Sequence, residues 1–457
     1  MRIGLFALAS MIALVAGRAG HTAPTPAPAS STLKIQIKEW RLKNGLRVLY
    51  SPHRRIPAVT VQVWYHAGSK DERVGIRGIA HMFEHMMFKG SQRVPPEKHA
   101  RMISAVGGST NAFTAEDVTA YHNTLPKQYL GFAMELEAER MRKLHLTLHT
   151  IKSEREVVKE EKRVRLENSP IGRALEAIRA MAYTRHPYAW TPAGHMKDLD
   201  RISRPDCQTF YDTYYMPNNA TVIVVGDVTE AEARRAVDRH FGPLPKGREP
   251  PRVTVNEPPQ AAMRTRQADW PSQLKVVLGA YHVPSARHPD MAALKVLSAV
   301  LSAGRSARLN QALVRKQKLA VAAGGFVLPQ EHPGLLMIWG IGLPTHDATK
   351  IKQALMAQVD LLVAKGVTDK ELAKAKNQLA TASLTKVQTI SGLAYQLGRS
   401  TYLHGDPRAF LTEVSRLDRV TDKDVLRVAK AYLQQTNLSL LTMDRTGKPA
   451  KQKGGRP

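Results

Sequence analysis

Three residues in one short segment have the types and the spacing of a metal-dependent hydrolytic site. The segment GIRGIAHMFEHMMFKGS contains His81, Glu84 and His85 in an H-x-x-E-H arrangement. On a helix, positions four residues apart share a face, so both imidazoles can reach one Zn²⁺ ion from adjacent turns. Glu84 lies beside that face and can reach a water at the metal rather than the metal itself. A surface helix with incidental histidines is the alternative.

A third ligand is required, because a catalytic zinc takes three protein ligands and keeps one position open. The stretch SEREVVKEEKRVRLENSP offers Glu154 and Glu161, which are two helical turns apart and therefore share a face. Glu160 points about 100° away on an ideal helix. A solvated helix with i,i+4 ion pairs is the alternative for this stretch, and we adopt it for Glu156 and Glu160.

Together these motifs resemble those of the pitrilysin/insulinase family of zinc peptidases, especially its processing-peptidase-like branch. In that family a ligand glutamate follows the H-x-x-E-H helix at a separation close to the 76 residues between His85 and Glu161. Other stretches agree over residues 35–445, among them GGSTNAFTAEDVTAYHNTLP, HPYAWTPAG and YYMPNNATVIVVGDV.

The resemblance implies metal-assisted peptide hydrolysis. His81, His85 and Glu161 would hold Zn²⁺, which activates water and polarises the scissile carbonyl. Glu84 would take the proton of the water and deliver it to the leaving amine, and Glu154 would orient a ligand histidine or adjust the charge of the site.

The resemblance also implies a substrate-binding strand. GGSTNAFT would form an edge strand that a peptide substrate extends main chain to main chain, with Asn111 and Ala112 at the pairing point. An ordinary strand that begins at glycine is the alternative.

In its second half the chain departs from the family pattern. Active members carry an arginine and a tyrosine that contact the substrate and the developing oxyanion, and alignment from Arg308 places Val314 and Val321 at these positions. Loss of oxyanion donors costs a factor of about 10²–10³ in rate. We therefore expect the zinc-bearing subunit of a heterodimer, whose homologous partner supplies both residues. A self-sufficient homodimer, and a peptide-binding or structural subunit without turnover, are the alternatives; the intact zinc motif argues against a structural subunit.

Hydrophobic patterning predicts the elements that position these residues. Two strand-like runs meet at Asn44-Gly45, which is a hairpin signal, and AVTVQVWYHAG alternates as a further strand. Helical patterns dominate residues 78–105 and 127–185. TVIVVGD, at residues 221–227, reads as a buried strand that precedes a helix.

An internal duplication organises the fold. Residues 202–227 resemble residues 420–445 at an offset of 218, and Glu154 lies 217 before Glu371. The sequence therefore predicts an α+β fold of two homologous α/β-sandwich halves, each an antiparallel-rich sheet covered by helices. The equivalent residues in the longer match are Asp206 and Asp424, Tyr214 and Tyr432, and Asn219 and Asn437.

The ends of the chain and its proline-rich middle suggest the boundaries. A basic start followed by an apolar run at residues 3–17 is typical of a signal peptide, with an uncleaved anchor as the alternative, so we expect export to the periplasm. The expected organisation is a signal peptide at 1–19, a flexible spacer at 20–32, a zinc-bearing half at 33–241, a linker at 242–268, a half without a zinc motif at 269–446 and a disordered basic tail at 447–457.

Composition excludes several classes of protein. The chain has 457 residues, of which 43% are hydrophobic and 23% charged, so it can bury a core and is not disordered throughout. The lone Cys207 excludes an internal disulfide and a zinc knuckle. The net charge of +28 favours anionic partners such as acidic peptides. Because no nucleic-acid-binding motif is present, we expect no nucleic-acid partner, and we expect no membrane span after the leader.

Overall fold

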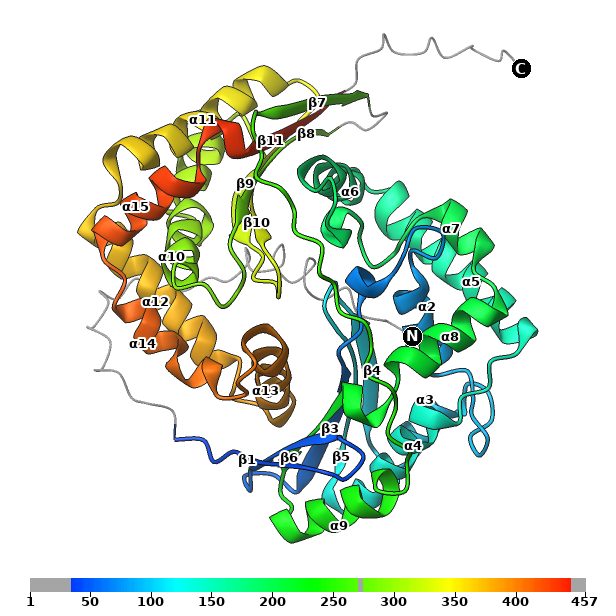
Figure 1. Cartoon of the computed structure of the whole chain (residues 1–457). Coiled ribbons are helices and arrows are strands. Elements are labelled where there is room, and N and C mark those ends of the chain that lie inside the picture. Colours follow the sequence, from blue (N-terminus) through cyan, green and yellow to red (C-terminus); the bar gives the residue numbers. More distant parts are fainter. Residues whose placement is uncertain (1–33, 270–273, 445–457) are drawn as a thin grey trace, which may run out of the picture. The chain divides into compact units, whose positions relative to one another are not determined.

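The computed structural model describes residues 34–269 and 274–444 (Figure 1). The expected leader at 1–19, spacer at 20–32 and tail at 447–457 lie outside these residues. The described residues form two compact units. Unit 1 comprises the residues up to Lys162, together with Arg185–Asn256 and Leu379–Asp418; unit 2 comprises Arg163–Thr184, Glu257–Gln378 and the residues from Arg419.

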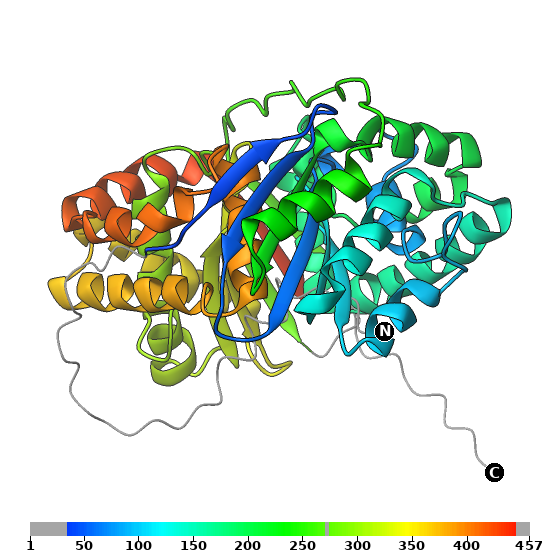
Figure 2. The same cartoon turned by 90° about the horizontal axis from the view of Figure 1, so that it is seen from below.

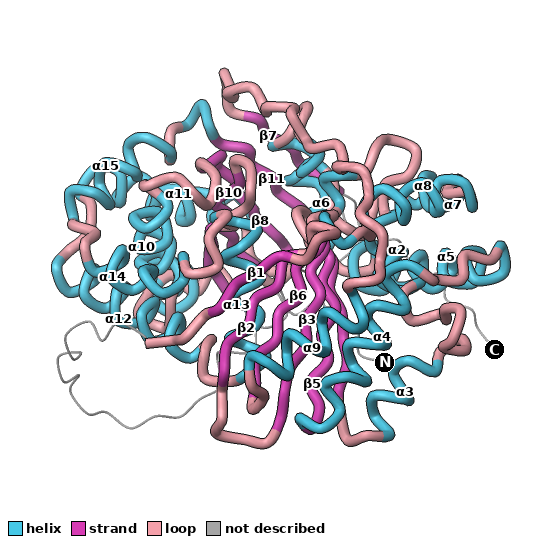
Figure 3. The backbone as a smooth tube through the Cα atoms, turned by 60° about the horizontal axis from the view of Figure 1, so that its bottom comes forward, coloured by secondary structure: helices cyan, strands magenta, loops and turns pink. Residues whose placement is uncertain are grey.

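Unit 1 is built on a six-stranded sheet with the order β1-β2-β6-β3-β5-β4, and Figure 3 labels β1, β2, β6, β3 and β5 of this sheet. Strands β2 and β6 are parallel and the other neighbours are antiparallel. The predicted hairpin at Asn44-Gly45 joins β1 to β2, and Gly45 takes a φ of 88°, which favours glycine. The strands are β1 Lys38–Arg41, β2 Arg47–Pro52, β3 Ala58–Tyr65, β4 Ser109–Thr114, β5 Thr119–Pro126 and β6 Ala220–Gly226.

Helices cover both faces of this sheet. On one face, β3 residues such as Val61 and Val63 share a core with α2, α4, α8 and α9; Figure 2 shows α9, in green, against the blue strands. On the other face, Trp64 packs against α13. The helices of unit 1 are α2 Ile79–Met86, α3 Lys98–Ala105, α4 Leu130–Arg142, α5 Leu148–Lys162, α7 Met196–Arg201, α8 Arg204–Tyr214, α9 Glu230–Phe241, α13 Ile390–His404 and α14 Glu413–Asp418, with short turns η2 Ser69–Asp71, η3 Lys127–Tyr129, η5 Pro187–Ala189, η6 Pro217–Asn219 and η8 Ala409–Thr412.

Unit 2 repeats this plan on a five-stranded sheet with the order β7-β11-β8-β10-β9. Only β7 and β11 pair in parallel among its described strands. Its strands are β7 Arg264–Asp269, β8 Lys275–Val283, β9 Ala322–Val327, β10 Gly334–Gly342 and β11 Leu438–Asp444. Its helices are α6 Pro170–Ala182, α10 Met291–Ser302, α11 Ala348–Lys365 and α15 Asp422–Tyr432, with π-helical turns η4 Arg163–Glu167 and η7 Asn310–Lys316 and the turn η9 Gln435–Asn437; α12 Asp369–Thr385 crosses the boundary between the units.

The duplication is visible in matching hydrogen bonds. Asn219 donates to the carbonyl oxygen of Tyr214 at 2.8 Å, and Asn437 donates to that of Tyr432 at 2.8 Å. Helices α8 and α15 each begin with a capping box. The predicted α+β fold of two homologous sandwich halves is therefore confirmed.

The units exchange segments, whereas the expected halves at 33–241 and 269–446 are continuous. Helix α6 comes from the first half of the sequence but packs against β8 and β11 of unit 2, and α13 comes from the second half but packs against β3 and β6 of unit 1. In unit 1 the second apolar face of the sheet, which includes Trp64 and Ile223, is covered by α13; in unit 2, α6 packs against β8 and β11.

Two expected boundaries differ in detail. The expected linker at 242–268 has no helix or strand up to residue 263 and then forms β7, whose backbone pairs with β11. The helical pattern at 78–105 is divided into α2 and α3, because Gly90 takes a φ of 107° and Pro95-Pro96 cannot continue a helix.

None of the helices in the described ranges is long and apolar enough to cross a membrane.

Candidate metal centre

The helix that carries the H-x-x-E-H motif is capped by a distant carboxylate. Helix α2 starts after Gly78, whose φ is 101° and which offers no capping side chain. Glu72 supplies the cap: its carboxylate accepts hydrogen bonds from Gly78 N at 2.9 Å, Ala80 N at 3.0 Å and Trp190 Nε1 at 3.0 Å. Burial raises the pKa of Glu72 to about 8, although these donors act in the opposite direction. The first turn of α2 is thereby fixed next to His81.

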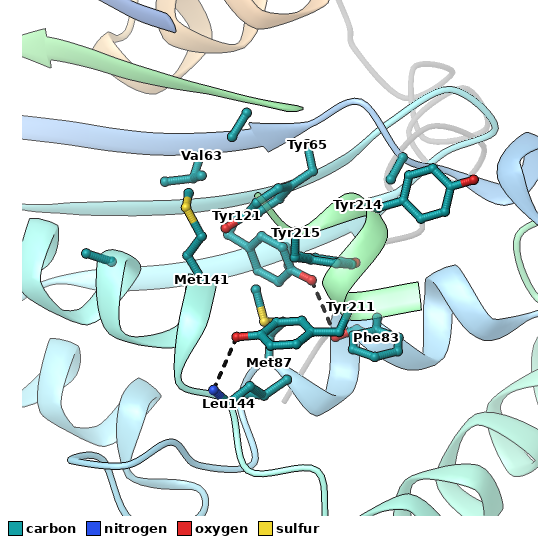
Figure 4. Close-up of a cluster of buried hydrophobic side chains, with 14 of the residues drawn as sticks. Val63, Tyr65, Phe83, Met87, Tyr121, Met141, Leu144, Tyr211, Tyr214 and Tyr215 are labelled. Atoms are coloured by element: carbon teal, nitrogen blue, oxygen red, sulfur yellow. Dashed lines mark hydrogen bonds between the residues drawn. The ribbon is translucent and has the colours of Figure 1, made fainter. Parts of the chain in front are cut away.

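A cluster of aromatic residues holds the other face of α2 (Figure 4). Phe83 lies 5.3 Å from the ring of Tyr215 and 6.0 Å from that of Tyr211, and Tyr121 donates a hydrogen bond to the Phe83 carbonyl oxygen at 3.4 Å. All four side chains are buried. Packing on this face sets the rotation of the helix and so the direction of its opposite, polar face.

The structure brings the three predicted metal ligands together. Ligand atoms of His81, His85 and Glu161 all lie within 4.8 Å of one another, and within the described residues they form the single group of this kind. His85 Nε2 is 3.3 Å from Glu161 Oε2, and His81 Nε2 is 3.9 Å from Glu161 Oε1. The imidazole rings are nearly perpendicular, with centroids 4.9 Å apart. Helix α5 supplies the glutamate and α2 both histidines.

This donor set fits a zinc ion. Zinc prefers imidazole nitrogen and carboxylate oxygen, and ligand atoms about 2.0–2.2 Å from a tetrahedral ion lie about 3.3–3.6 Å from each other. Both histidines are buried, and Glu161 is largely so. The three ligand atoms, which lie within 4.8 Å of one another, would have to move slightly closer together to bind one ion.

Behind His85 lies a second layer of charge. Glu154 is 1% exposed, and its Oε2 atom is 3.6 Å from His85 Nδ1, the ring nitrogen that faces away from Glu161. Its Oε1 atom is 3.0 Å from Lys89 Nζ. Burial lowers the pKa of His85, but the Glu154 and Glu161 carboxylates outweigh burial and raise it to about 9.

Glu84 lies beside the ligands and contacts the edge strand. Its Oε2 atom accepts a hydrogen bond from Thr114 Oγ1 at 2.7 Å. Thr114 ends β4, which is an edge of the six-stranded sheet, as predicted for GGSTNAFT. Asn111 and Ala112 lie on the same strand, and the Asn111 side-chain oxygen accepts a hydrogen bond from Ala112 N at 2.9 Å.

Unit 2 has serines at the positions equivalent to the two ligand histidines of unit 1. At the offset of 217 residues, Ser298 and Ser302 of α10 stand where His81 and His85 stand in unit 1. Val314 is half-buried in η7, and Val321, which precedes β9, is 48% exposed.

Thr114, Lys89 and Glu72 were missed by sequence reasoning. Thr114 lies in GGSTNAFT and Lys89 in GIRGIAHMFEHMMFKGS, but their partners Glu84 and Glu154 lie on other elements, and periodicity within one element carries no signal for such contacts. Glu72 lies six residues before Gly78, the residue after which α2 begins. The sequence around Gly78 therefore lacks the usual capping-box pattern, in which a Ser or Thr at the helix start is followed three residues later by a Glu or Gln.

The chain is similar to known proteins over most of its length. Residues 47–192 match the family model described as "Insulinase (Peptidase family M16)", and residues 201–379 match "Peptidase M16 inactive domain". The zinc protease PqqE of Helicobacter pylori is 33% identical over 407 residues, which cover 86% of this chain and 90% of that protein. A probable mitochondrial-processing peptidase subunit beta of Arabidopsis thaliana is 25% identical over 92% of this chain and 81% of its own length.

A solved structure extends the likeness to three dimensions. The crystal structure of a protease from Helicobacter pylori superposes with a TM-score of 0.87 and 30% identity, over 90% of this chain and 100% of that one. Two adjoining family models match the chain, one relative is 33% identical to it, and a solved structure shares its fold. The chain therefore belongs to the insulinase family, peptidase family M16.

Proposed function

We propose that this protein is a zinc-dependent endopeptidase that hydrolyses peptides or unfolded polypeptides. The observation that carries the proposal is the convergence of His81, His85 and Glu161 within 4.8 Å, with Glu84 hydrogen-bonded to the end of an edge strand beside them. Zinc held by the two histidines and Glu161 would polarise the scissile carbonyl and activate a water.

Glu84 is the base in this proposal. It accepts a proton from the attacking water and later donates it to the leaving amine. Thr114 steadies its carboxylate through the 2.7 Å hydrogen bond that it donates to Glu84 Oε2. Glu154 orients His85 through the ring nitrogen that does not face Glu161.

The substrate would extend the sheet at β4. An edge strand offers unpaired main-chain groups on one side, and an extended peptide can satisfy them as a further strand. Asn111 and Ala112 would lie at the pairing point, three and two residues before the Thr114 that contacts Glu84. This spacing supports delivery of a peptide bond to the metal centre.

We further propose that the chain is the zinc-bearing subunit of a heterodimer. Val314 and Val321 replace the arginine and tyrosine expected in active members, and neither valine can donate a hydrogen bond to an oxyanion. A homologous subunit that carries both residues would complete the site. The apolar run at residues 3–17 supports export to the periplasm.

Zinc content and hydrolysis of a fluorogenic peptide test the proposal on the purified chain, alone and mixed with a homologous subunit that carries the arginine–tyrosine pair. We expect about one zinc per chain and hydrolysis only after mixing. A chain without zinc, or zinc content unchanged in Glu161→Gln, would contradict the metal centre. Full activity of the chain alone would contradict the heterodimer, while zinc without hydrolysis in any mixture would point to a peptide-binding protein.

A further inference from the structure

We infer that Lys89 is a positioning residue of the metal centre: its ammonium group holds Glu154 against His85, and Glu97 holds Lys89 in place. The inference rests on the proposed function, because it assumes that His85 ligates zinc. It adds two linked ion pairs, Glu154–Lys89 and Lys89–Glu97, which involve neither a ligand nor the base and which end at the exposed side chain of Glu97.

Glu154 has a nitrogen-bearing side chain close to each of its two oxygen atoms. Its Oε2 atom lies 3.6 Å from His85 Nδ1, and its Oε1 atom lies 3.0 Å from Lys89 Nζ. A histidine that ligates zinc is neutral, so a carboxylate buried beside His85 alone would lack a cation, and a buried charge without a partner is expensive. The ammonium group of Lys89 supplies the cation and holds the carboxylate where it can keep the imidazole in one orientation.

Lys89 is in turn held from the solvent side. Its Nζ atom is 2.9 Å from the carboxylate of Glu97, whose side chain is 65% exposed. Glu97 adopts a left-handed φ of 61° immediately before α3, a conformation that non-glycine residues rarely take. Such backbone conformations persist where the surrounding structure imposes them. In this conformation the Glu97 side chain forms the ion pair with Lys89.

A purely architectural role is the competing explanation, and unit 2 offers its matched control. There Glu371, which lies 217 residues after Glu154, pairs with Arg308 at 2.7 and 2.8 Å. Ser298 and Ser302 occupy the positions of the histidines in that unit. The Lys89–Glu154 pair thus lies beside histidines, whereas the Arg308–Glu371 pair does not. Substituting the cation of each pair therefore distinguishes an effect on stability, expected in both units, from an effect on zinc binding, expected only in unit 1.

The test is zinc affinity, measured at fixed pH by competition with a chelating dye, together with thermal unfolding of the metal-free protein. We expect Lys89→Met to weaken zinc binding about 10–100-fold, as is usual for residues that support a ligand. Glu97→Gln should weaken it less, and Lys89→Arg, which keeps the charge, should retain zinc better than Lys89→Met. Arg308→Met should lower the unfolding temperature and leave zinc affinity within about twofold.

A double-mutant cycle makes the result decisive. In the Glu154→Gln background, Lys89→Met should add less than about twofold, because the carboxylate through which Lys89 acts is gone. Wild-type affinity in both Lys89→Met and Glu97→Gln, or an equal loss in the two backgrounds, would overturn the inference while leaving the proposed function intact. A wild-type chain that fails to bind zinc would overturn both. Zinc binding without peptide hydrolysis would remove the endopeptidase proposal alone.

Discussion

At the residue scale, the candidate centre combines three residues of helix α2 with side chains that reach it from other elements. His81, Glu84 and His85 share one helix, so their relative placement follows from helical geometry. Glu161 was predicted through the separation typical of the family, and the structure brings it to both histidines. Thr114 and Lys89 reach the site from β4 and from the segment after α2, and tertiary contacts of this kind leave no periodic trace in a single sequence.

Replacement of the proposed base should separate chemistry from metal binding. Glu84→Gln keeps the shape of the side chain and its contact with Thr114 but cannot take a proton. We expect the rate of peptide hydrolysis to fall about 10²–10⁴-fold at unchanged zinc content. Steady-state kinetics and metal analysis of the same preparation measure both quantities. Loss of zinc together with activity would instead make Glu84 a ligand.

At the element scale, α2 is held from two sides: Glu72 caps its first turn and the aromatic cluster around Phe83 packs behind it. The helical patterns and the hairpin strands were predictable because their periodicities are local. The exchange of α6 and α13 between the units was not, since the duplicated pattern shows which segments are alike and carries no information about which sheet each helix covers.

Removal of the distant cap should loosen this helix. Glu72→Ala leaves the N–H groups of Gly78 and Ala80 without their acceptor in a buried site. We expect a loss of about 1–3 kcal/mol in the free energy of unfolding, measured with denaturant. Glu156→Ala, which removes an exposed carboxylate of α5, is the control and should change stability by less than about 0.5 kcal/mol. Equal effects in the two variants would argue against the cap.

The ion pair of unit 2 should shape the response to acid. Hydrogen bonds from Arg308 lower the pKa of Glu371 to about 2, whereas a glutamate in an unfolded chain titrates at about 4.3. Because the folded pKa is the lower one, the pair stabilises the protein fully above about pH 5, and this contribution is lost as the pH falls towards 2.

Arg308→Met should therefore flatten the acid limb of the stability profile. We expect the variant to be less stable than the wild type by about 1 kcal/mol at neutral pH, since solvent screens a partly exposed pair, and the difference should shrink as the pH falls below about 4. Denaturation at a series of pH values measures it. A difference that stays constant with pH would mean that Glu371 is not the titrating group.

At the scale of the whole molecule, charge is the most distinctive property. A net charge of +28 attracts anionic partners at long range, and dissolved salt screens this attraction. If the substrate is an acidic peptide, kcat/KM should fall at least threefold, by a rough estimate, when salt rises from about 50 to about 500 mM. A neutral peptide of the same length is the control. Identical salt dependence for the two peptides would show that the basic surface does not steer substrate.

The exchanged helix α13 has a consequence for the order in which the chain can fold. All strands of the first sheet have been synthesised once residue 226 emerges, but the helix that covers Trp64, Ile223 and Val225 begins only at residue 390. At about 5–20 residues per second, translation leaves this apolar face without its cover for roughly 8–30 s. A fragment that ends at residue 241 would keep it bare permanently. We therefore expect either half, expressed alone, to expose an apolar sheet face and to aggregate more readily than the full chain.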